Sequence, residues 1–174
     1  MILLFCGMSG AGKTTIAERV KMKMESLNIN VEVIDADEYR NFLFKDLGYS
    51  KIDRCENIRR LAFLANKFSQ YKIVTIICAI SPYEDIREEI KSKYKNVKII
   101  FINCKIPELI KRDTKGLYKK ALLPNDHVDK LHNLTGINDP FEIPEKPDIV
   151  INTDSNDIET CANDLIKFVQ LQII

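Results

Sequence analysis

The sequence predicts an α/β protein with a parallel sheet of about five strands, helices on both faces and a lid segment. Three observations predict this class. Apolar, β-branched runs alternate with amphipathic stretches along most of the chain. A glycine-rich loop joins the first apolar run to the first amphipathic stretch. A long, basic and irregular segment interrupts the alternation after residue 112.

The expected strands are continuous apolar runs, which are typical of parallel strands buried on both faces. They occupy residues 2–6, 31–35, 73–80, 97–104 and 148–152. Ligands of such sheets bind at the carboxyl ends of the strands. We therefore expect the glycine-rich loop, residues 35–37 and residues 79–83 to face one crevice.

The expected helices lie between these strands. Ser50 and Asp53 form a capping box, followed at helical spacing by Ile58, Leu61, Ala62, Ala65 and Phe68. Further helices are expected over residues 13–27, 85–94 and 155–171. In the last of these, the inward residues should be Ile158, Cys161, Leu165 and Phe168 or Val169. Residues 113–146 are too long for a tight connection and are expected to form a lid, with a short polar helix near 126–132.

Length and composition indicate one domain that spans residues 1–174. The net charge of +1 argues against nucleic acid or an anionic membrane as a partner. The apolar start MILLFC is too short for a signal sequence, and no run reaches membrane-spanning length, so we expect a cytoplasmic protein. The five cysteines form no C-x-x-C pair and are expected to be reduced structural thiols.

Residues 7–14 match the pattern G-x-x-x-x-G-K-T, between an expected strand and an expected helix. In such a P-loop, successive backbone N–H groups wrap a phosphate, and the helix N-terminus adds partial positive charge. Lys13 should reach the outer phosphates and the Thr14 hydroxyl should bind Mg²⁺. The residues expected to bind the nucleoside triphosphate here are Gly7, Ser9, Gly10, Ala11, Gly12, Lys13, Thr14 and Thr15.

Asp35 and Asp37 lie just beyond the second expected strand. Two carboxylates at this place can bind Mg²⁺ and accept a proton from a hydroxyl group. The alternative is that Asp37 only caps the N-terminus of a following helix, a position that Asp favours. Because no Asp ends the third strand, we expect the metal carboxylate to be one of these two.

Basic side chains suggest how an anionic acceptor is held. Arg54 and Asn57 lie one helical turn apart, so that they and Arg40 can face one phosphate or sulfate group. Arg59 and Arg60 are interpreted as solvated residues beside acidic neighbours.

A second basic cluster lies in the suspected lid. Arg112, Lys115, Lys119 and Lys120 could stabilise charge on a transferring phosphoryl group, with Arg112 at ATP, or could form solvated surface. His127 and His132 are interpreted as lid residues without a catalytic role.

The remaining sequence helps to decide which class of P-loop protein this is: a GTPase, a motor or ATPase, a small kinase or a binding module. The Asn-Lys pair at residues 66–67 lies in an expected helix and is followed by Phe68 and Ser69, so the guanine-reading pattern Asn-Lys-x-Asp of a GTPase is missing. Motors and the ATPases of large assemblies normally need more chain. A nucleotide or small-metabolite kinase fits best. The alternative of another class is a non-catalytic nucleotide-binding module, which the intact acidic pair and Lys-Thr pair disfavour.

Longer motifs are more specific, and they resemble the adenylylsulfate (APS) kinase family of P-loop nucleotide kinases. They are GMSGAGKTT, DADEYRNFLFKDLGYSKIDRCENIRR, ISPY, DTKGLYKKA and LTGINDPFEIPEKPDIVINT, in order over nearly the whole chain. The resemblance implies a P-loop kinase fold, ATP as phosphoryl donor, Mg²⁺ as cofactor and a homodimer. It also implies phosphorylation of the ribose 3′-hydroxyl of adenylylsulfate, which gives 3′-phosphoadenylylsulfate.

Carried over position by position, the resemblance implies roles for individual residues. The implied catalytic residues are Lys13, Asp35, Asp37 and Lys115. Thr14 and Asp35 are implied for the metal. The implied acceptor-binding residues are Asp37, Arg40, Tyr49, Arg54, Asn57, Ile80, Ser81, Pro82, Lys115 and Leu134.

The chain departs from the family pattern mainly where the acceptor base should lie. Tyr49 replaces one of two Phe rings that sandwich the adenine in the family, and Leu134 replaces the other. The loss of one ring removes stacking of roughly 1 kcal/mol. An alternative acceptor is therefore cytidine diphosphoramidate, whose smaller base needs less stacking area and which relatives phosphorylate at the same hydroxyl in capsular polysaccharide modification.

Overall fold

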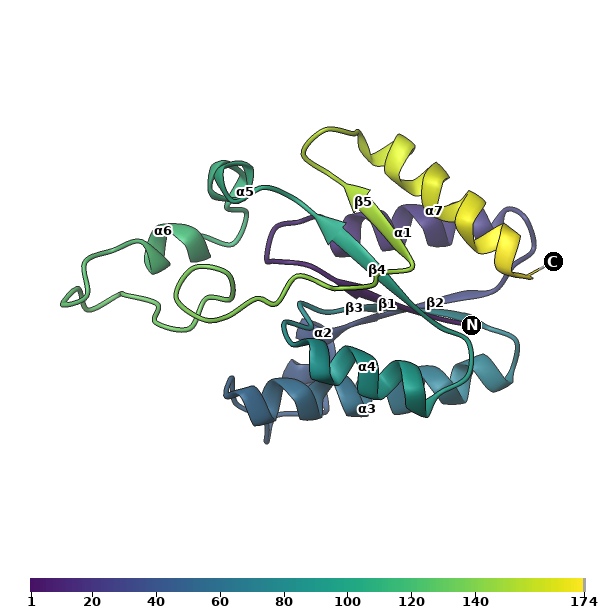
Figure 1. The fold of residues 1–174 in the computed structure, drawn as a ribbon, viewed down its shortest axis with the longest axis horizontal. Helices are drawn as coiled ribbons and strands as arrows, with labels where there is room; N and C mark the ends of the chain where they lie inside the picture. Colours follow the sequence, from purple (N-terminus) through teal and green to yellow (C-terminus); the bar gives the residue numbers. More distant parts are fainter. Residues whose placement is uncertain (174) are drawn as a thin grey trace.

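A computed structural model describes residues 1–173, with a five-stranded sheet between two helical layers (Figure 1). The strands are β1 (Ile2–Cys6), β2 (Val31–Asp35), β3 (Val74–Cys78), β4 (Val97–Asn103) and β5 (Ile149–Asn152). The helices are α1 (Lys13–Glu25), α2 (Ala36–Phe42), α3 (Lys51–Gln70), α4 (Glu84–Lys93), α5 (Ile106–Arg112), α6 (Leu117–Ala121) and α7 (Ile158–Ile173).

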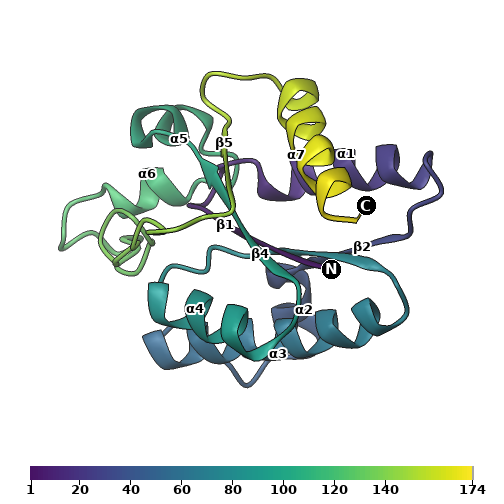
Figure 2. The ribbon, with the colours of Figure 1, turned by 45° about the vertical axis from the view of Figure 1, so that its right-hand side comes forward.

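All the strand pairs are parallel, and the strand order is β2-β3-β1-β4-β5. Helices α1 and α7 cover one face of the sheet, and α3 and α4 cover the other (Figures 1 and 2). The central strand β1 is buried on both faces: Leu3 and Phe5 join the core beneath α1 and α7, while Leu4 joins the core beneath α3 and α4. This arrangement confirms the predicted fold class.

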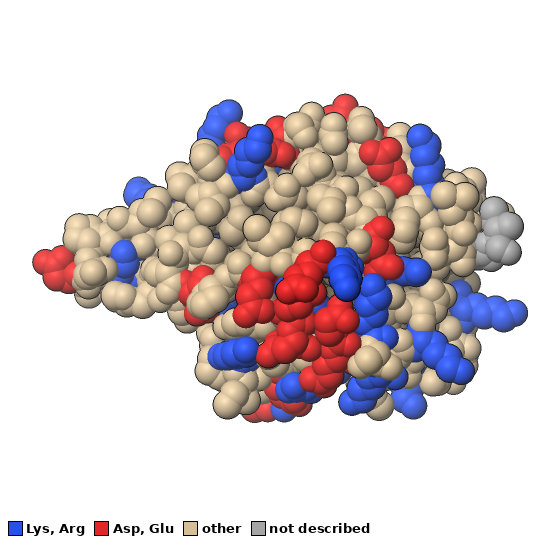
Figure 3. Space-filling model, viewed as in Figure 1, with Lys and Arg blue, Asp and Glu red and all other residues tan. Residues whose placement is uncertain are grey.

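The carboxyl ends of the strands lie at one edge of the sheet, where α5, α6 and the long segment after α6 are gathered (Figure 1). The start of β1 and the C-terminal end of α7 lie toward the opposite edge in both ribbon views (Figures 1 and 2). On the face drawn in Figure 3, acidic side chains gather near α4 with basic ones beside them, in keeping with the near-zero net charge.

The prediction of a helix near residues 126–132 is wrong. This stretch forms turns, in which the N–H of His127 bonds the carbonyl of Pro124 and the N–H of Lys130 bonds that of His127. Pro124, Asn125 and Asp126 favour turns, and Val128 is 94% exposed, so no apolar face supports a helix here. The short helices α5 and α6 were not predicted, and α7 begins at Ile158 rather than at residue 155.

The predictions of the α3 cap and of unpaired cysteines are confirmed. Ser50 caps α3 by accepting from the N–H of Asp53 at 3.2 Å, and its hydroxyl donates to the Asp53 carboxylate at 2.7 Å. All five cysteines are buried and unpaired. Within residues 1–173, no helix combines the length and apolar character needed to span a bilayer.

Candidate active site

The glycine-rich loop, residues 7–14, joins β1 to α1 at the carboxyl edge of the sheet. A side chain at Gly7 would collide with the carbonyl oxygen of Ile102 on β4, so glycine lets the loop lie close to the sheet. Gly12 precedes α1 with a φ of 93°, a left-handed conformation that glycine adopts without strain. The loop therefore leads directly into the partially positive N-terminus of α1.

The loop and the carboxyl ends of β2 and β3 enclose a cavity of about 240 Å³, which we call the phosphate cavity. Its loop residues are Ser9, Gly10, Gly12, Lys13, Thr14 and Thr15. Gly7 and Ala11, which were also expected to bind the triphosphate, support the loop without lining this cavity. Asp35, Asp37 and Lys115 line its other side, so the structure brings together the predicted catalytic residues.

Lys13 folds back over the loop. Its Nζ donates to the carbonyl oxygens of Gly7 at 2.8 Å and Met8 at 2.9 Å. Burial of the ammonium within the loop lowers the pKa of Lys13 to about 8. Phosphate oxygens in the cavity would offer this ammonium stronger, charged acceptors than the two carbonyl groups.

Asp35 ends β2 and serves two partners with separate oxygens. Oδ1 accepts from the backbone N–H groups of Asp37 at 2.9 Å and Glu38 at 3.4 Å, which makes Asp35 the N-cap of α2. Oδ2 accepts from the Thr14 hydroxyl at 2.7 Å. The alternative prediction, that Asp37 caps the following helix, named the wrong residue. Asp35 is the N-cap of α2, and Asp37 lies in its first turn.

The Thr14 and Asp35 oxygens fit Mg²⁺ better than a metal that needs a protein cage. Mg²⁺ binds through one or two protein oxygens, with water and substrate phosphates completing its shell. Residues 1–173 contain no cluster of three or more His, Cys, Asp or Glu side chains that could hold a metal by themselves. The hydroxyl and the carboxylate lie side by side at the phosphate cavity, which is the donor set that Mg²⁺ prefers.

Asp37 and Lys115 meet across the crevice. The Nζ of Lys115 lies 2.5 Å from Oδ2 of Asp37, and this hydrogen bond raises the pKa of Lys115. Lys115 is presented by a short loop before α6. Asp113 accepts from the N–H groups of Tyr118 at 3.0 Å and Lys119 at 2.9 Å, and so fixes this loop.

Helix α6 is also attached to the P-loop. The Tyr118 hydroxyl donates to the carbonyl oxygen of Ser9 at 2.8 Å, and burial raises the pKa of Tyr118 to about 12. Tyr118 is 1% exposed, so this hydrogen bond is sheltered from water. The contact ties the first part of the lid to the glycine-rich loop.

A larger cavity of about 580 Å³ adjoins the phosphate cavity, and we call it the acceptor cavity. Tyr49, Leu134, Arg40 and Arg54 line it, together with Asp37 and Lys115. The guanidinium carbons of Arg40 and Arg54 lie 4.9 Å and 5.6 Å from the centre of the Tyr49 ring. Arginine forks and one aromatic ring therefore share a cavity suited to an anionic nucleotide.

Arg54 is fixed by its surroundings. Its Nε donates to the carbonyl of Tyr49 at 2.9 Å, while Nη2 donates to that of Asn133 at 2.8 Å and pairs with Asp139 at 3.1 Å. Arg40 donates to the carbonyls of Leu47 at 3.2 Å and Gly48 at 2.6 Å. Each guanidinium is therefore held in place by backbone carbonyl groups.

A small side cavity of about 50 Å³ continues the acceptor cavity toward α3 and β3. Asn57, Ile80, Ser81 and Pro82 line it, with Arg54. The Oδ1 atom of Asn57 and the hydroxyl of Ser81 are buried and lack hydrogen-bond partners among residues 1–173. Such orphaned groups are costly unless a ligand or water satisfies them.

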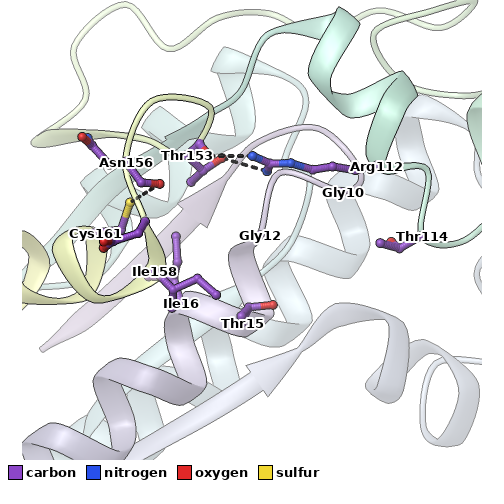
Figure 4. Close-up of a pocket in the computed structure, with 11 residues that line it drawn as sticks. Gly10, Gly12, Thr15, Ile16, Arg112, Thr114, Thr153, Asn156, Ile158 and Cys161 are labelled. Atoms are coloured by element: carbon purple, nitrogen blue, oxygen red, sulfur yellow. Dashed lines mark hydrogen bonds between the residues drawn. The ribbon is translucent and has the colours of Figure 1, made fainter.

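Besides the phosphate cavity and the acceptor cavity with its side cavity, a further cavity of about 430 Å³, which we call the third cavity, lies behind the P-loop, between α1 and the start of α7 (Figure 4). Gly10, Gly12 and Thr15 form one wall. The sequence pattern missed the opposite wall, made by Thr114, Thr153, Asn156, Asp157, Ile158 and Cys161. Thr114 and Thr153 lie in two of the longer motifs but were given no role, and the other four residues belong to no motif. The position of Thr153 directly after the last strand was the available signal.

Arg112 lines this third cavity rather than the acceptor cavity. Its Nη2 donates to the carbonyl of Thr153 at 2.6 Å (Figure 4). Its Nε donates to the carboxylate of Glu108 at 3.3 Å. The exposed Lys119 and Lys120 line none of the four cavities described. The basic lid cluster therefore separates: Lys115 lies at the phosphate and acceptor cavities, and Arg112 lies at the cavity behind the P-loop.

Four further basic residues lie outside the cavities described. Arg59 of α3 pairs with Glu89 of α4 at 2.7 Å, and Arg60 pairs with Asp46 at 2.8 Å, so both are half-buried beside acidic neighbours. His127 and His132 are exposed and line none of the four cavities.

Comparison with known proteins agrees with this geometry. A family model described as Adenylylsulphate kinase matches residues 1–152. An adenylyl-sulfate kinase of Synechococcus sp. (strain JA-3-3Ab) is 38% identical over 159 residues, which are 91% of this chain and 88% of that protein. A probable bifunctional SAT/APS kinase 2 of Sorangium cellulosum is 42% identical over 152 residues; this region is 87% of the present chain but only 25% of the bifunctional protein.

The fold is shared as well. The Mycobacterium tuberculosis APS kinase CysC, solved in complex with AMPPNP and APS, superposes with a TM-score of 0.89 at 29% identity, over 97% of this chain and 96% of that one. A family match over most of the sequence, an intact P-loop and a paired acid and lysine at the crevice all agree. The chain therefore belongs to the adenylylsulphate kinase family, P-loop kinases that transfer phosphate from ATP to a hydroxyl acceptor.

Proposed function

We propose that this chain transfers the γ-phosphate of MgATP to the ribose 3′-hydroxyl of adenylylsulfate and releases ADP and 3′-phosphoadenylylsulfate. One observation carries the proposal: Asp37 and Lys115 line both the phosphate cavity and the acceptor cavity. Asp37 and Lys115 are the charged side chains that the two cavities share, and a hydroxyl group in the larger cavity would meet them on the way to a phosphate in the smaller one. The acid and the ammonium therefore stand where a phosphoryl group would cross.

On the donor side, the P-loop N–H groups and Lys13 bind the β- and γ-phosphates, while Arg112 and the third cavity receive the nucleoside. Thr14 and Asp35 would hold Mg²⁺, which would supply positive charge to neutralise the phosphates. The N-cap bond of Asp35 to α2 keeps its other oxygen directed at Thr14. The chain thus orients the metal ligands before the substrate arrives.

On the acceptor side, Asp37 accepts the proton of the 3′-hydroxyl as its oxygen attacks the γ-phosphorus. The bond between that phosphorus and the β–γ bridging oxygen breaks, and ADP leaves. Lys115 and Lys13 stabilise negative charge on the transferring group. Arg40, Arg54 and Asn57 bind the phosphosulfate, and the turn formed by Ile80, Ser81 and Pro82 closes the side cavity behind it.

The base of the acceptor is received between Tyr49 and Leu134. Leu134 is 4% exposed and packs into the core, so it offers an apolar surface without a ring. Relatives of similar length carry the name adenylyl-sulfate kinase, and this supports adenylylsulfate rather than cytidine diphosphoramidate as the acceptor of this chain. The smaller stacking surface then lowers the affinity for the adenine base, and adenylylsulfate remains the acceptor.

An acceptor panel tests the proposal. We expect a higher kcat/KM for adenylylsulfate than for cytidine diphosphoramidate, and Leu134→Phe should lower the KM for adenylylsulfate several-fold because it adds about 1 kcal/mol of stacking. Leu134→Met is the matched control, since it changes the shape of the side chain without adding a ring. Preference for the cytidine compound would overturn the assignment of the acceptor.

We further propose a homodimer in the cytoplasm, with residues 1–174 forming one kinase domain. The exposed Phe42, Leu43 and Ile52 near the α2–α3 connection support an interface, since exposed apolar patches commonly mark contact surfaces. Light scattering on the purified chain measures the assembly. A mass of one chain at micromolar concentration would contradict the dimer.

A further inference from the structure

Arg87, in the middle of α4, is a fully buried charge that the proposed reaction does not use. Its guanidinium donates hydrogen bonds to three residues. Ser81 and Glu84 lie just before and at the start of α4, and Glu142 lies far along the chain. Nη1 donates to the carbonyl of Ser81 at 2.5 Å, Nε donates to the Glu84 carboxylate at 2.8 Å, and Nη2 donates to the carbonyl of Glu142 at 2.7 Å. Burying a charge is costly unless its partners are well placed, so this position needs an explanation.

The first partner lies in the wall of the acceptor site. Ser81 has a φ of 43°, an uncommon conformation for a residue other than glycine. Its hydroxyl is buried, lines the side cavity and has no partner among the residues that the structure describes. Arg87 binds the carbonyl of this same residue, and so stabilises a strained turn whose other groups face the cavity.

Glu142, another partner of Arg87, lies at the end of the segment that carries Leu134 of the acceptor cavity. The N–H of Glu142 donates to the carbonyl of Pro82 at 2.8 Å, and its carboxylate accepts from the N–H of Glu84 at 2.6 Å. The ring of Phe141 stacks on Phe101 of β4, with 6.1 Å between the ring centres. Glu142 is thereby joined to both the turn and the start of α4.

The loop between residues 133 and 142 is thus tied at two places by arginines. Arg54 binds its beginning, through the carbonyl of Asn133 and the carboxylate of Asp139. Arg87 binds its end, through the carbonyl of Glu142. Leu134 lies between these ties and lines the acceptor cavity.

We propose that Arg87 is a positioning residue for the acceptor. It holds the turn at residues 80–82 against the returning end of the loop at residues 133–142, and so sets the separation of two walls of the acceptor site. It lines none of the cavities described and acts through Ser81 and Glu142. This inference rests on the proposed function, because it assigns the acceptor to that site.

The test is a comparison of kinetic constants for both substrates. Arg87→Met keeps much of the side-chain volume and removes all the donors. We expect it to raise the KM for adenylylsulfate by about tenfold or more, while the KM for ATP changes by less than about twofold. Arg87→Lys should fall between, since an ammonium keeps the charge but cannot span three acceptors in a plane.

A matched control separates positioning from stability. Ile90→Ala removes a fully buried side chain from the same helix, and this apolar side chain makes no hydrogen bond to any of the three partners of Arg87. If Ile90→Ala, at a similar loss in Tm, raises the KM for adenylylsulfate as much as Arg87→Met, the proposal is overturned. It is also overturned if the Arg87→Met enzyme keeps the wild-type KM.

If Arg87→Met fails to fold, Glu142→Pro tests the same junction from an exposed position. It removes the N–H that binds Pro82 and the carboxylate that binds Glu84, but keeps the carbonyl that Arg87 binds. We expect a smaller rise in the KM for adenylylsulfate alone, and an unchanged KM overturns the inference. A wild-type chain that neither binds nor phosphorylates adenylylsulfate overturns both the inference and the proposed function, whereas an active wild type with an unaffected Arg87→Met variant overturns the inference alone.

Discussion

At the scale of single residues, the two acids after β2 differ because their oxygens have different partners. Asp35 uses one oxygen to cap α2 and the other to bind Thr14. Asp37 is exposed, and its carboxylate accepts a hydrogen bond from the long side chain of Lys115. A carboxylate held from two sides suits a metal ligand, whereas one beside an ammonium can exchange a proton with an incoming hydroxyl group.

Asp37→Asn should therefore separate binding from chemistry. We expect kcat to fall by about 10²- to 10⁴-fold, because the amide cannot accept the proton, while ATP affinity stays near that of the wild type. Single-turnover rates and titration calorimetry with an ATP analogue measure the two effects. Glu38→Gln, one residue further on the same helix, is the charge-matched control; full activity in Asp37→Asn would remove this side chain from the mechanism.

The lowered pKa of Lys13 predicts a pH dependence with a definite sign. The ammonium is charged below its pKa of about 8 and becomes neutral as the pH rises through that value. Because the charged form binds the phosphates, kcat/KM for ATP should fall above about pH 8. The fall should be smaller in kcat, since bound phosphates stabilise the ammonium. The range from about pH 7 to about pH 9 covers one unit on either side of this pKa. A constant kcat/KM for ATP over that range would contradict the role of the Lys13 ammonium in phosphate binding.

At the scale of elements, α6 is the part of the lid that is attached to the P-loop. We expect Tyr118→Phe, which removes only the hydroxyl bonded to Ser9, to lower kcat/KM for ATP by about two- to tenfold, the equivalent of one buried hydrogen bond. Steady-state kinetics at saturating acceptor measure this effect. Tyr94→Phe is the control, because no hydrogen bond from its hydroxyl to another side chain or to the backbone is present in residues 1–173. Equal effects in both variants would argue against the tether.

Elements with local signals could be predicted from the sequence, and those that depend on distant partners could not. The run ILLFC is buried throughout, and the Ser50–Asp53 box opens α3 as expected. The turns at residues 126–132 were mistaken for a helix because a polar stretch carries no signal of what it packs against. Thr153 and Asn156 were missed since the sheet, and not any motif, brings them behind the P-loop.

The same division applies to the candidate site. Lys13, Thr14, Asp35 and Asp37 meet because parallel strands end at one edge, which sequence periodicity already implies. Arg87 has no such signal: a single Arg in a charged helix resembles any solvated residue until α4 is docked on the sheet. Its importance follows from burial, which depends on the whole fold.

At the scale of the whole molecule, ligand binding should stabilise the fold because the donor site joins elements from both ends of the chain. We expect saturating MgATP, at about 100 times its Kd, to raise Tm by roughly 5–10 °C. Removing Mg²⁺ with a chelator should reduce the shift, and Lys13→Met should abolish it while Asp37→Asn retains it. Differential scanning fluorimetry measures all four conditions, and an unchanged Tm with MgATP would contradict the assignment of the donor site.

The placement of the chain ends has a practical consequence. The start of β1 and the end of α7 lie toward the edge of the sheet opposite to α5 and α6 (Figures 1 and 2). A reporter or immobilisation tag can therefore be joined at either end without standing over the crevice. An enzyme tethered to a surface in this way would present its substrate entrance to the solution, which suits it to biosensors and to multi-enzyme scaffolds.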